Sequence, residues 1–253
     1  MMRTNIKNLL SVVLLIVAAC SCGHRNSEGT LLPEFEEYTF SSAEEGRYSV
    51  NIRYQRIANA HRSEALASID NLNYAHTFDE YFVVPPCVEE SVAALVEDYA
   101  AICNHNHTED EECVACSYTL DQQAMLLRNE TILCFETCVE TYSGGAHGGY
   151  SLLYECYDLA TGAFFDFEYL IDGEWAEAMQ QLIYHKLYEV CDEVLFVDSP
   201  ESIYIPRSVK ITDDGLLLVY QPYEVAAFNV GIVTVEISEA ELLEAGAPLV
   251  WVE

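Results

Sequence analysis

The sequence predicts an α+β fold, with a largely antiparallel sheet and a long covering helix, preceded by a small strand-helix-helix module. Three observations support this class. Strand-like runs with a two-residue period flank a loop of four glycines, one long helical pattern covers residues 173–194, and more strand-like runs follow it. Because strands are grouped before and after one helix instead of alternating with helices, hairpin pairing is favoured over parallel crossovers.

Residues 1–19 are typical of a lipoprotein signal peptide and are not expected to belong to the fold. Arg3 and Lys7 form a positive end, and a short apolar run leads to Val-Ala-Ala before Cys20. The run is too short for a permanent bilayer helix. We therefore expect lipidation at Cys20, with an ordinary secretory signal as the alternative. Ser21, in place of an aspartate, favours an outer-membrane anchor facing the periplasm.

The charge balance restricts the partners of the chain. It has 11 basic and 42 acidic residues, a formal charge of −31, which becomes −33 when Arg3 and Lys7 leave with the signal peptide. A polyanion gains nothing from counterion release by nucleic acid, so nucleic-acid binding is excluded. An anionic membrane surface is also a poor partner. The charge fits a cationic partner and, equally, simple solubility.

Residues 20–33 are polar and predict a tether, and residues 34–110 predict the small N-terminal module. A strand is expected within residues 44–57, with alternate apolar side chains on one face: Tyr48, Val50, Ile52 and Tyr54. Ser63 is the expected N-cap of a helix that carries Leu66, Ile69 and Asn73 on one stripe. A second helix should follow Pro85 and Pro86, with this apolar stripe: Val88, Val92, Leu95, Val96, Tyr99 and Ile102.

Residues 111–253 predict the larger C-terminal domain. Strands are expected at residues 118–127, 131–142 and 150–159, with a turn at residues 128–130. Leu133, Phe135 and Val139 should share a face of the second. Asp172 is the expected N-cap of the helix at residues 173–194, whose stripe is Trp175, Met179, Leu182, Ile183, Leu187 and Val190. A turn at residues 213–215, a strand carrying Val233, Val235 and Ile237, and a helical turn at residues 239–244 complete the pattern.

The ten cysteines of the chain allow several interpretations of their role. A hairpin register would place Cys138 near Cys156, either as a disulfide or as packed apolar side chains. The cluster of thiols and imidazoles in residues 103–116 has ligand types that zinc prefers, although an oxidising compartment favours sulfur–sulfur bonds. The residues concerned are Cys103, His105, His107, Cys113 and Cys116. We expect no metal and no cofactor.

The glycine-rich loop at residues 143–149 and the Pro-Tyr-Glu loop at residues 222–224 are the expected partner-binding surface, since aromatic side chains beside glycine turns enter a groove at little conformational cost. The predicted binding residues are Tyr142, Gly144, Gly145, His147, Gly148, Tyr150, Tyr223 and Glu224.

His147 could act as a general base with Asp158, Asp166 or Asp172, or could bond a carbonyl and fix its loop. The common catalytic motifs are absent, so we expect no enzymatic activity.

Two motifs over roughly residues 118–244 resemble one bacterial extracytoplasmic domain. The first is Ser-Gly-Gly-Ala-His-Gly followed by Tyr-Asp-Leu-x-Thr-Gly, and the second is a strand pair followed by Pro-Tyr-Glu, a glycine and a last strand. This domain is known from the RsiV-type lysozyme-sensing anti-sigma factor and from accessory regions of peptidoglycan deacetylases. The resemblance implies a binding module for a cationic protein such as lysozyme. The alternatives are a cell-wall (peptidoglycan) associated accessory domain and an enzyme that uses the His147 loop.

Overall fold

The structure is a computed structural model that describes residues 24–105 and 115–251, so the signal peptide and Cys20 lie outside the described residues. The described part contains eight strands and four α-helices. The strands are β1 (Phe35–Glu44), β2 (Tyr48–Ile57), β3 (Cys116–Leu127), β4 (Ile132–Tyr142), β5 (Gly149–Asp158), β6 (Ser208–Ile211), β7 (Gly215–Tyr220) and β8 (Val233–Ser238). The helices are α1 (Glu64–Phe78), α2 (Val88–His105), α3 (Ala176–Cys191) and α4 (Glu239–Glu244).

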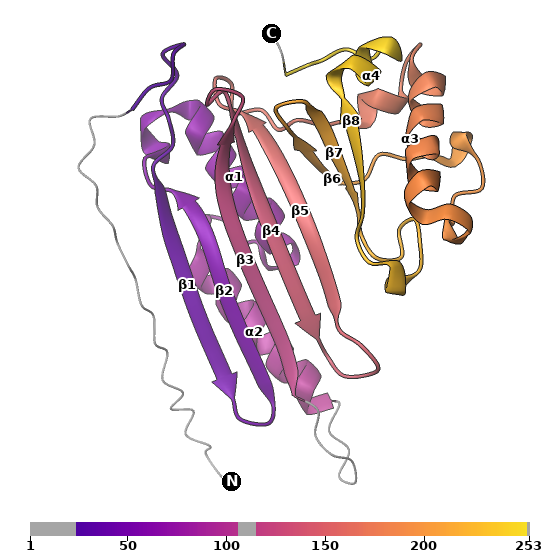
Figure 1. Cartoon of the computed structure of the whole chain (residues 1–253). Helices are drawn as coiled ribbons and strands as arrows, with labels where there is room; N and C mark the ends of the chain where they lie inside the picture. The colour runs from indigo at the N-terminus through magenta and orange to yellow at the C-terminus, as the bar shows by residue number, and fades with distance from the viewer. Residues whose placement is uncertain (1–23, 106–114, 252–253) are drawn as a thin grey trace, which may run out of the picture.

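The strands form a five-stranded sheet, β1-β2-β3-β4-β5, and a three-stranded sheet, β6-β7-β8. Helices α1 and α2 lie behind the larger sheet, and α3 lies beside the smaller one (Figure 1). The fold is therefore of the predicted mixed α+β class. Strand pairing is antiparallel except between β2 and β3, which are parallel. None of the helices in the described ranges is both long and apolar enough to cross a bilayer.

Strand β2 confirms the two-residue period, because all four predicted face residues are at most 7% exposed. Its antiparallel partner β1 was not predicted. Within β1 only Tyr38 and Phe40 are buried, and the other positions are mostly polar or exposed. An edge strand with one buried pair gives too weak an alternation to identify from sequence. The Ser63 cap is confirmed, since its hydroxyl accepts a hydrogen bond from the Leu66 amide.

Helices α1 and α2 connect the parallel strands β2 and β3, as a parallel pairing requires a long crossover. The boundary expected at residues 110 and 111 falls inside this crossover, and strands from both sides of it share one sheet. A disulfide between Cys103 and Cys116 joins the end of α2 to the start of β3. These two sulfurs are therefore not free zinc ligands, and His107 and Cys113 lie outside the described residues. Within those residues, no three potential ligands gather to hold a metal ion.

The described part of the expected tether is not a tether. Leu31 and Leu32 are 8% and 6% exposed, and they pack with Ile57, Leu133 and Phe135. The Asn26 side chain donates to the Glu130 carbonyl at 3.0 Å. Two leucines in a polar segment are too few to form a recognisable apolar pattern, so the sequence alone did not predict this packing.

Strand β4 is buried on both faces over its first four residues. Leu133 and Phe135 pack with α1, whereas Ile132 and Cys134 pack with α3 and the smaller sheet. The predicted proximity of Cys138 and Cys156 is wrong, because the register pairs Cys156 with Cys134, which is buried and free. The hairpin is thus shifted by four positions from the expected register.

The smaller sheet meets the edge of β5 through side chains. The Ser208 hydroxyl accepts from the Tyr154 amide at 2.9 Å and donates to the Leu152 carbonyl at 3.1 Å. The Gln221 side-chain amide bonds both backbone groups of Leu152, at 3.0 and 2.9 Å. We call this contact the seam. It satisfies backbone groups that an open sheet edge would leave unpaired.

Two details of the covering helix were predicted wrongly. Helix α3 begins at Ala176 after Trp175, with no side-chain cap, so Asp172 is not its N-cap. Val190, placed in the buried stripe, is 57% exposed, whereas Met179, Ile183 and Leu187 are fully buried. The buried stripe continues to Cys191, four residues after Leu187, so Val190 lies beside the stripe and faces solvent.

Candidate functional site

The glycine loop connects β4 to β5, and its geometry requires glycine at particular positions. Gly144 and Gly145 have φ of +96° and +95°, in the left-handed region. A Cβ at Gly148 would lie 2.4 Å from the Thr141 carbonyl oxygen, closer than any side chain allows. The Tyr142 hydroxyl donates to the Gly145 carbonyl at 3.0 Å and closes the loop. Tyr142, Gly144 and Gly145 thus shape the loop.

The Pro-Tyr-Glu loop follows β7 and is held by its own hydrogen bonds. The Glu224 carboxylate accepts from the Gln221 amide at 2.5 Å. The Tyr223 amide donates to the Ala226 carbonyl at 3.1 Å. Tyr223 itself has a φ of +73°, unusual for a residue with a side chain, and its ring is 59% exposed. Glu224 therefore caps the turn, and Tyr223 is displayed by it.

The structure brings the two loops together around Phe228, which sequence analysis did not identify. The His147 ring stacks on Phe228 with centroids 3.9 Å apart and 19° between the planes. Tyr223 and Tyr150 lie 5.5 and 5.6 Å from the same ring. We call His147, Tyr150, Tyr223 and Phe228 the aromatic platform. Together with Gly148, Gly149, Gln221 and Pro222 they line a shallow hollow of about 240 Å³.

Hydrogen bonding assigns the tautomer of a neutral His147. Its Nδ1 lies 2.9 Å from the Gly148 carbonyl oxygen, which can only accept, so Nδ1 carries the proton. Nε2 then holds a lone pair, and the Tyr223 hydroxyl donates to it at 3.4 Å. Asp158, Asp166 and Asp172 are not among these partners or in the lining of the hollow. The ring is therefore held by its own loop and by Tyr223, and neither of these partners is a carboxylate.

A carboxylate stands beside the platform. Glu140 of β4 is directly opposite Tyr150 of β5 in the antiparallel register, and both are exposed. Opposite residues in such a pair project from the same face with Cβ atoms roughly 5 Å apart. Ring faces and a nearby carboxylate both attract a cation. The surface can therefore bind an arginine or lysine side chain of a partner.

Phe228 could not be assigned from the sequence because its role depends on contacts with both loops. A weak signal was Gly231, three positions later. It has a φ of +87°, and a Cβ there would lie 3.0 Å from the Tyr150 hydroxyl. This close approach places the segment after β7 against the start of β5. The platform is thus assembled by tertiary packing and not by either motif alone.

The fold and this site define an α+β protein with an exposed aromatic surface built from two loops and the residues beside them. Residues 172–239 match the family model described as "Protein of unknown function (DUF3298)". No curated protein matches the chain.

Two crystal structures of DUF3298 family proteins are similar to this chain. One is from Bacteroides fragilis NCTC 9343, with 16% identity, a TM-score of 0.63, and coverage of 83% of this chain and 92% of that one. The other is from Pseudomonas aeruginosa PAO1, with 16% identity, a TM-score of 0.54, and coverage of 83% and 93%. At this identity the likeness shows the fold alone.

Proposed function

We propose that this protein is an envelope-anchored binding module that captures a cationic protein or peptide on the aromatic platform, with lysozyme-type muramidases as first candidates. The observation that carries the proposal is the meeting of four aromatic rings, from the two loops and the residues beside them, on a chain with 42 acidic and 11 basic residues. The resemblance to a lysozyme-sensing domain supports the choice of partner. Its two motifs supply both loops of the platform.

The two features have different physical roles in this proposal. The distributed negative charge speeds the encounter with a basic partner, and salt screens it. The platform supplies short-range affinity, because tyrosine and phenylalanine rings bury a large area and stack on guanidinium groups. Their loops are already held by internal hydrogen bonds, so little conformational freedom is lost on binding.

Titration of purified residues 20–253 with lysozyme at ~150 mM salt tests the binding claim, since charge attraction reaches only ~8 Å there. Tyr223→Ala should weaken binding about tenfold, the size expected for a central aromatic anchor. Tyr188→Ala is the matched control, because that ring is 46% exposed on α3, away from the platform. Equal affinities for the two variants, or loss of all binding at this salt, would contradict the proposal.

The proposed anchor is a lipid on Cys20, which places the module in the cell envelope, on the outer membrane facing the periplasm. Growth with labelled palmitate should give a labelled protein, and Cys20→Ala should abolish the label. Cys138→Ala is the control, since it removes an exposed thiol from β4 and leaves the signal sequence intact. Label retained in the Cys20 variant would refute lipidation at this residue.

A further inference from the structure

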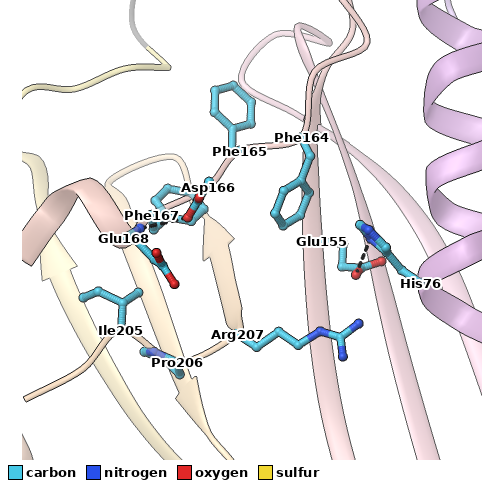
Figure 2. Close-up of a pocket in the computed structure, with 10 residues that line it drawn as sticks. All are labelled: His76, Glu155, Phe164, Phe165, Asp166, Phe167, Glu168, Ile205, Pro206 and Arg207. Atoms are coloured by element: carbon cyan, nitrogen blue, oxygen red, sulfur yellow. Dashed lines mark hydrogen bonds and ion pairs between the residues drawn. The ribbon is translucent and has the colours of Figure 1, made fainter. Parts of the chain in front are cut away.

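A second cavity lies between the two sheets, away from the aromatic platform. Its volume is about 460 Å³, and α1, β5 and the segments at residues 164–168 and 205–207 enclose it (Figure 2). We call it the Arg207 cleft. The side chains that line it are mixed in character: a histidine, three carboxylates, three phenylalanines and one arginine.

One wall of the cleft is a buried polar cluster. The side chain of Glu155 is only 10% exposed, and its Oε1 lies 2.9 Å from Nδ1 of His76. The Tyr157 hydroxyl lies 3.5 Å from the other oxygen of Glu155, and burial and this carboxylate raise the pKa of Tyr157. Phe164 packs edge-on against His76 at 5.6 Å. The Glu155 carboxylate is thus hydrogen-bonded within the wall, which fixes the imidazole and the adjoining ring.

Arg207 and Arg25 are the two arginines in the described residues without a carboxylate partner, and Arg25 instead donates to the Gly29 carbonyl. Five arginines in the described residues lie within 4.0 Å of a carboxylate: Arg47, Arg53, Arg56, Arg62 and Arg128. Arg207 is exposed and has no such pair among the described residues, although three carboxylates line its own cleft. Its guanidinium extends below Glu155 and His76 (Figure 2). This planar fork of donors is suited to a ligand carboxylate.

Two carboxylates lie on the other side of the opening. Asp166 and Glu168 are exposed, and neither forms an ion pair within the described part of the chain. Asp166 also accepts a hydrogen bond from the Glu168 amide at 2.9 Å, which fixes the turn that carries both side chains. Phe164, 37% exposed, lies between these carboxylates and the His76 wall (Figure 2). The opening therefore presents separated opposite charges beside an apolar ring.

We propose that the Arg207 cleft binds a small zwitterion of the α-amino-acid type with an apolar side chain. The ligand carboxylate would lie on Arg207, its ammonium group near Asp166 and Glu168, and its side chain against Phe164. A simple anion is disfavoured, because three carboxylates line the cleft with one arginine. A simple cation would leave Arg207 unmatched. This site is independent of the proposed function, since the two surfaces share no residue.

Calorimetric titration with three related probes tests the charge pattern. Phenylalanine has both charges, phenethylamine lacks the carboxylate, and 3-phenylpropionate lacks the ammonium group. Binding of phenylalanine should be detectable when its concentration is raised to about 20 mM. Each truncated probe should have an affinity at least roughly tenfold lower, because it loses a charge-assisted hydrogen bond. Equal binding of all three probes, or no binding of phenylalanine, would overturn the proposal.

Arg207→Gln separates the cleft from non-specific binding. This substitution should lower the affinity for phenylalanine by roughly 10- to 100-fold and leave the affinity for phenethylamine unchanged. Arg62→Gln is the matched control, because it removes an exposed arginine that is 3.9 Å from Glu34 and does not line the cleft. Both variants should unfold thermally like the parent without ligand, since both residues are on the surface. An unchanged phenylalanine affinity in Arg207→Gln would refute the assignment.

Discussion

Gly162 offers a test of how the Thr-Gly turn after β5 packs on α1. Its φ is +77°, and a Cβ built there would lie 2.6 Å from the carbonyl oxygen and 2.7 Å from the Cα of Ala65. The Gly162 carbonyl also accepts from the Ser68 hydroxyl at 3.3 Å. Asp158 holds the turn by accepting from the Thr161 amide at 2.6 Å. Both partners of the contact are therefore fixed.

Two terms add in Gly162→Ala. A left-handed backbone costs an alanine about 1–2 kcal/mol, and overpacking against a fixed backbone costs about 1–3 kcal/mol more. Gly46→Ala isolates the cost of the left-handed backbone, because the φ of Gly46 is +73° and nothing lies within 4 Å of a Cβ built there. The expected loss in free energy of unfolding is thus roughly 2–5 kcal/mol for Gly162→Ala and about 1–2 kcal/mol for Gly46→Ala.

Urea denaturation of the parent and both variants measures the two losses, with unchanged slopes showing that the transition itself is the same. The difference between the variants should be about 1–3 kcal/mol, or several degrees in thermal midpoint. Losses equal within about 0.5 kcal/mol would show that α1 does not press on the turn. In that case the glycine would be needed for its backbone conformation alone.

Two further predictions concern stability. Lys186 and the Ser238 groups at the N-terminus of α4 lower the pKa of Glu241 to about 2. Glu241→Gln should lower the free energy of unfolding by about 1 kcal/mol at pH 7, a small value because solvent screens the partly exposed pair with Lys186. Because the pKa of Glu241 is depressed in the folded state, this loss should fade as pH falls from about 4 to 2. Replacing Cys103 and Cys116 by serine should lower the free energy of unfolding, measured by chemical denaturation, by about 3 kcal/mol, whereas Cys138→Ser should leave it nearly unchanged. Equal unfolding midpoints for the two variants would contradict the disulfide.

The sequence predicted elements whose pattern is local and strong. Strand β2 has a full alternation of buried residues, and α1 has a serine cap and a clear stripe, so both were predicted correctly. Strand β1 was missed because its burial depends on pairing with β2 and not on its own pattern. The Cys138 register was wrong because strand pairing is set by the whole hairpin, including a loop of uncertain length.

Sites are harder to predict because their residues come from separate elements. The sequence indicated His147 and Tyr223 as members of two loops, but only the fold shows that both contact Phe228. His76 and Glu155 carry no local signal, since a histidine on a helix and a glutamate in a strand are common in acidic chains. Their pairing follows from α1 packing against β5, which no sequence period encodes.

Strand β5 also connects the two proposed sites. Tyr150 at its start belongs to the aromatic platform, and Glu155 further along lines the Arg207 cleft. Between them, Ser208 and Gln221 bond its backbone across the seam. Ser208→Ala would remove the partner of the Tyr154 amide, whereas the Leu152 carbonyl would keep its bond from Gln221. The unpaired amide would weaken the seam and disturb both surfaces at once. Joint loss of lysozyme and phenylalanine binding would therefore indicate seam damage, whereas loss of one ligand alone assigns the effect to its own site.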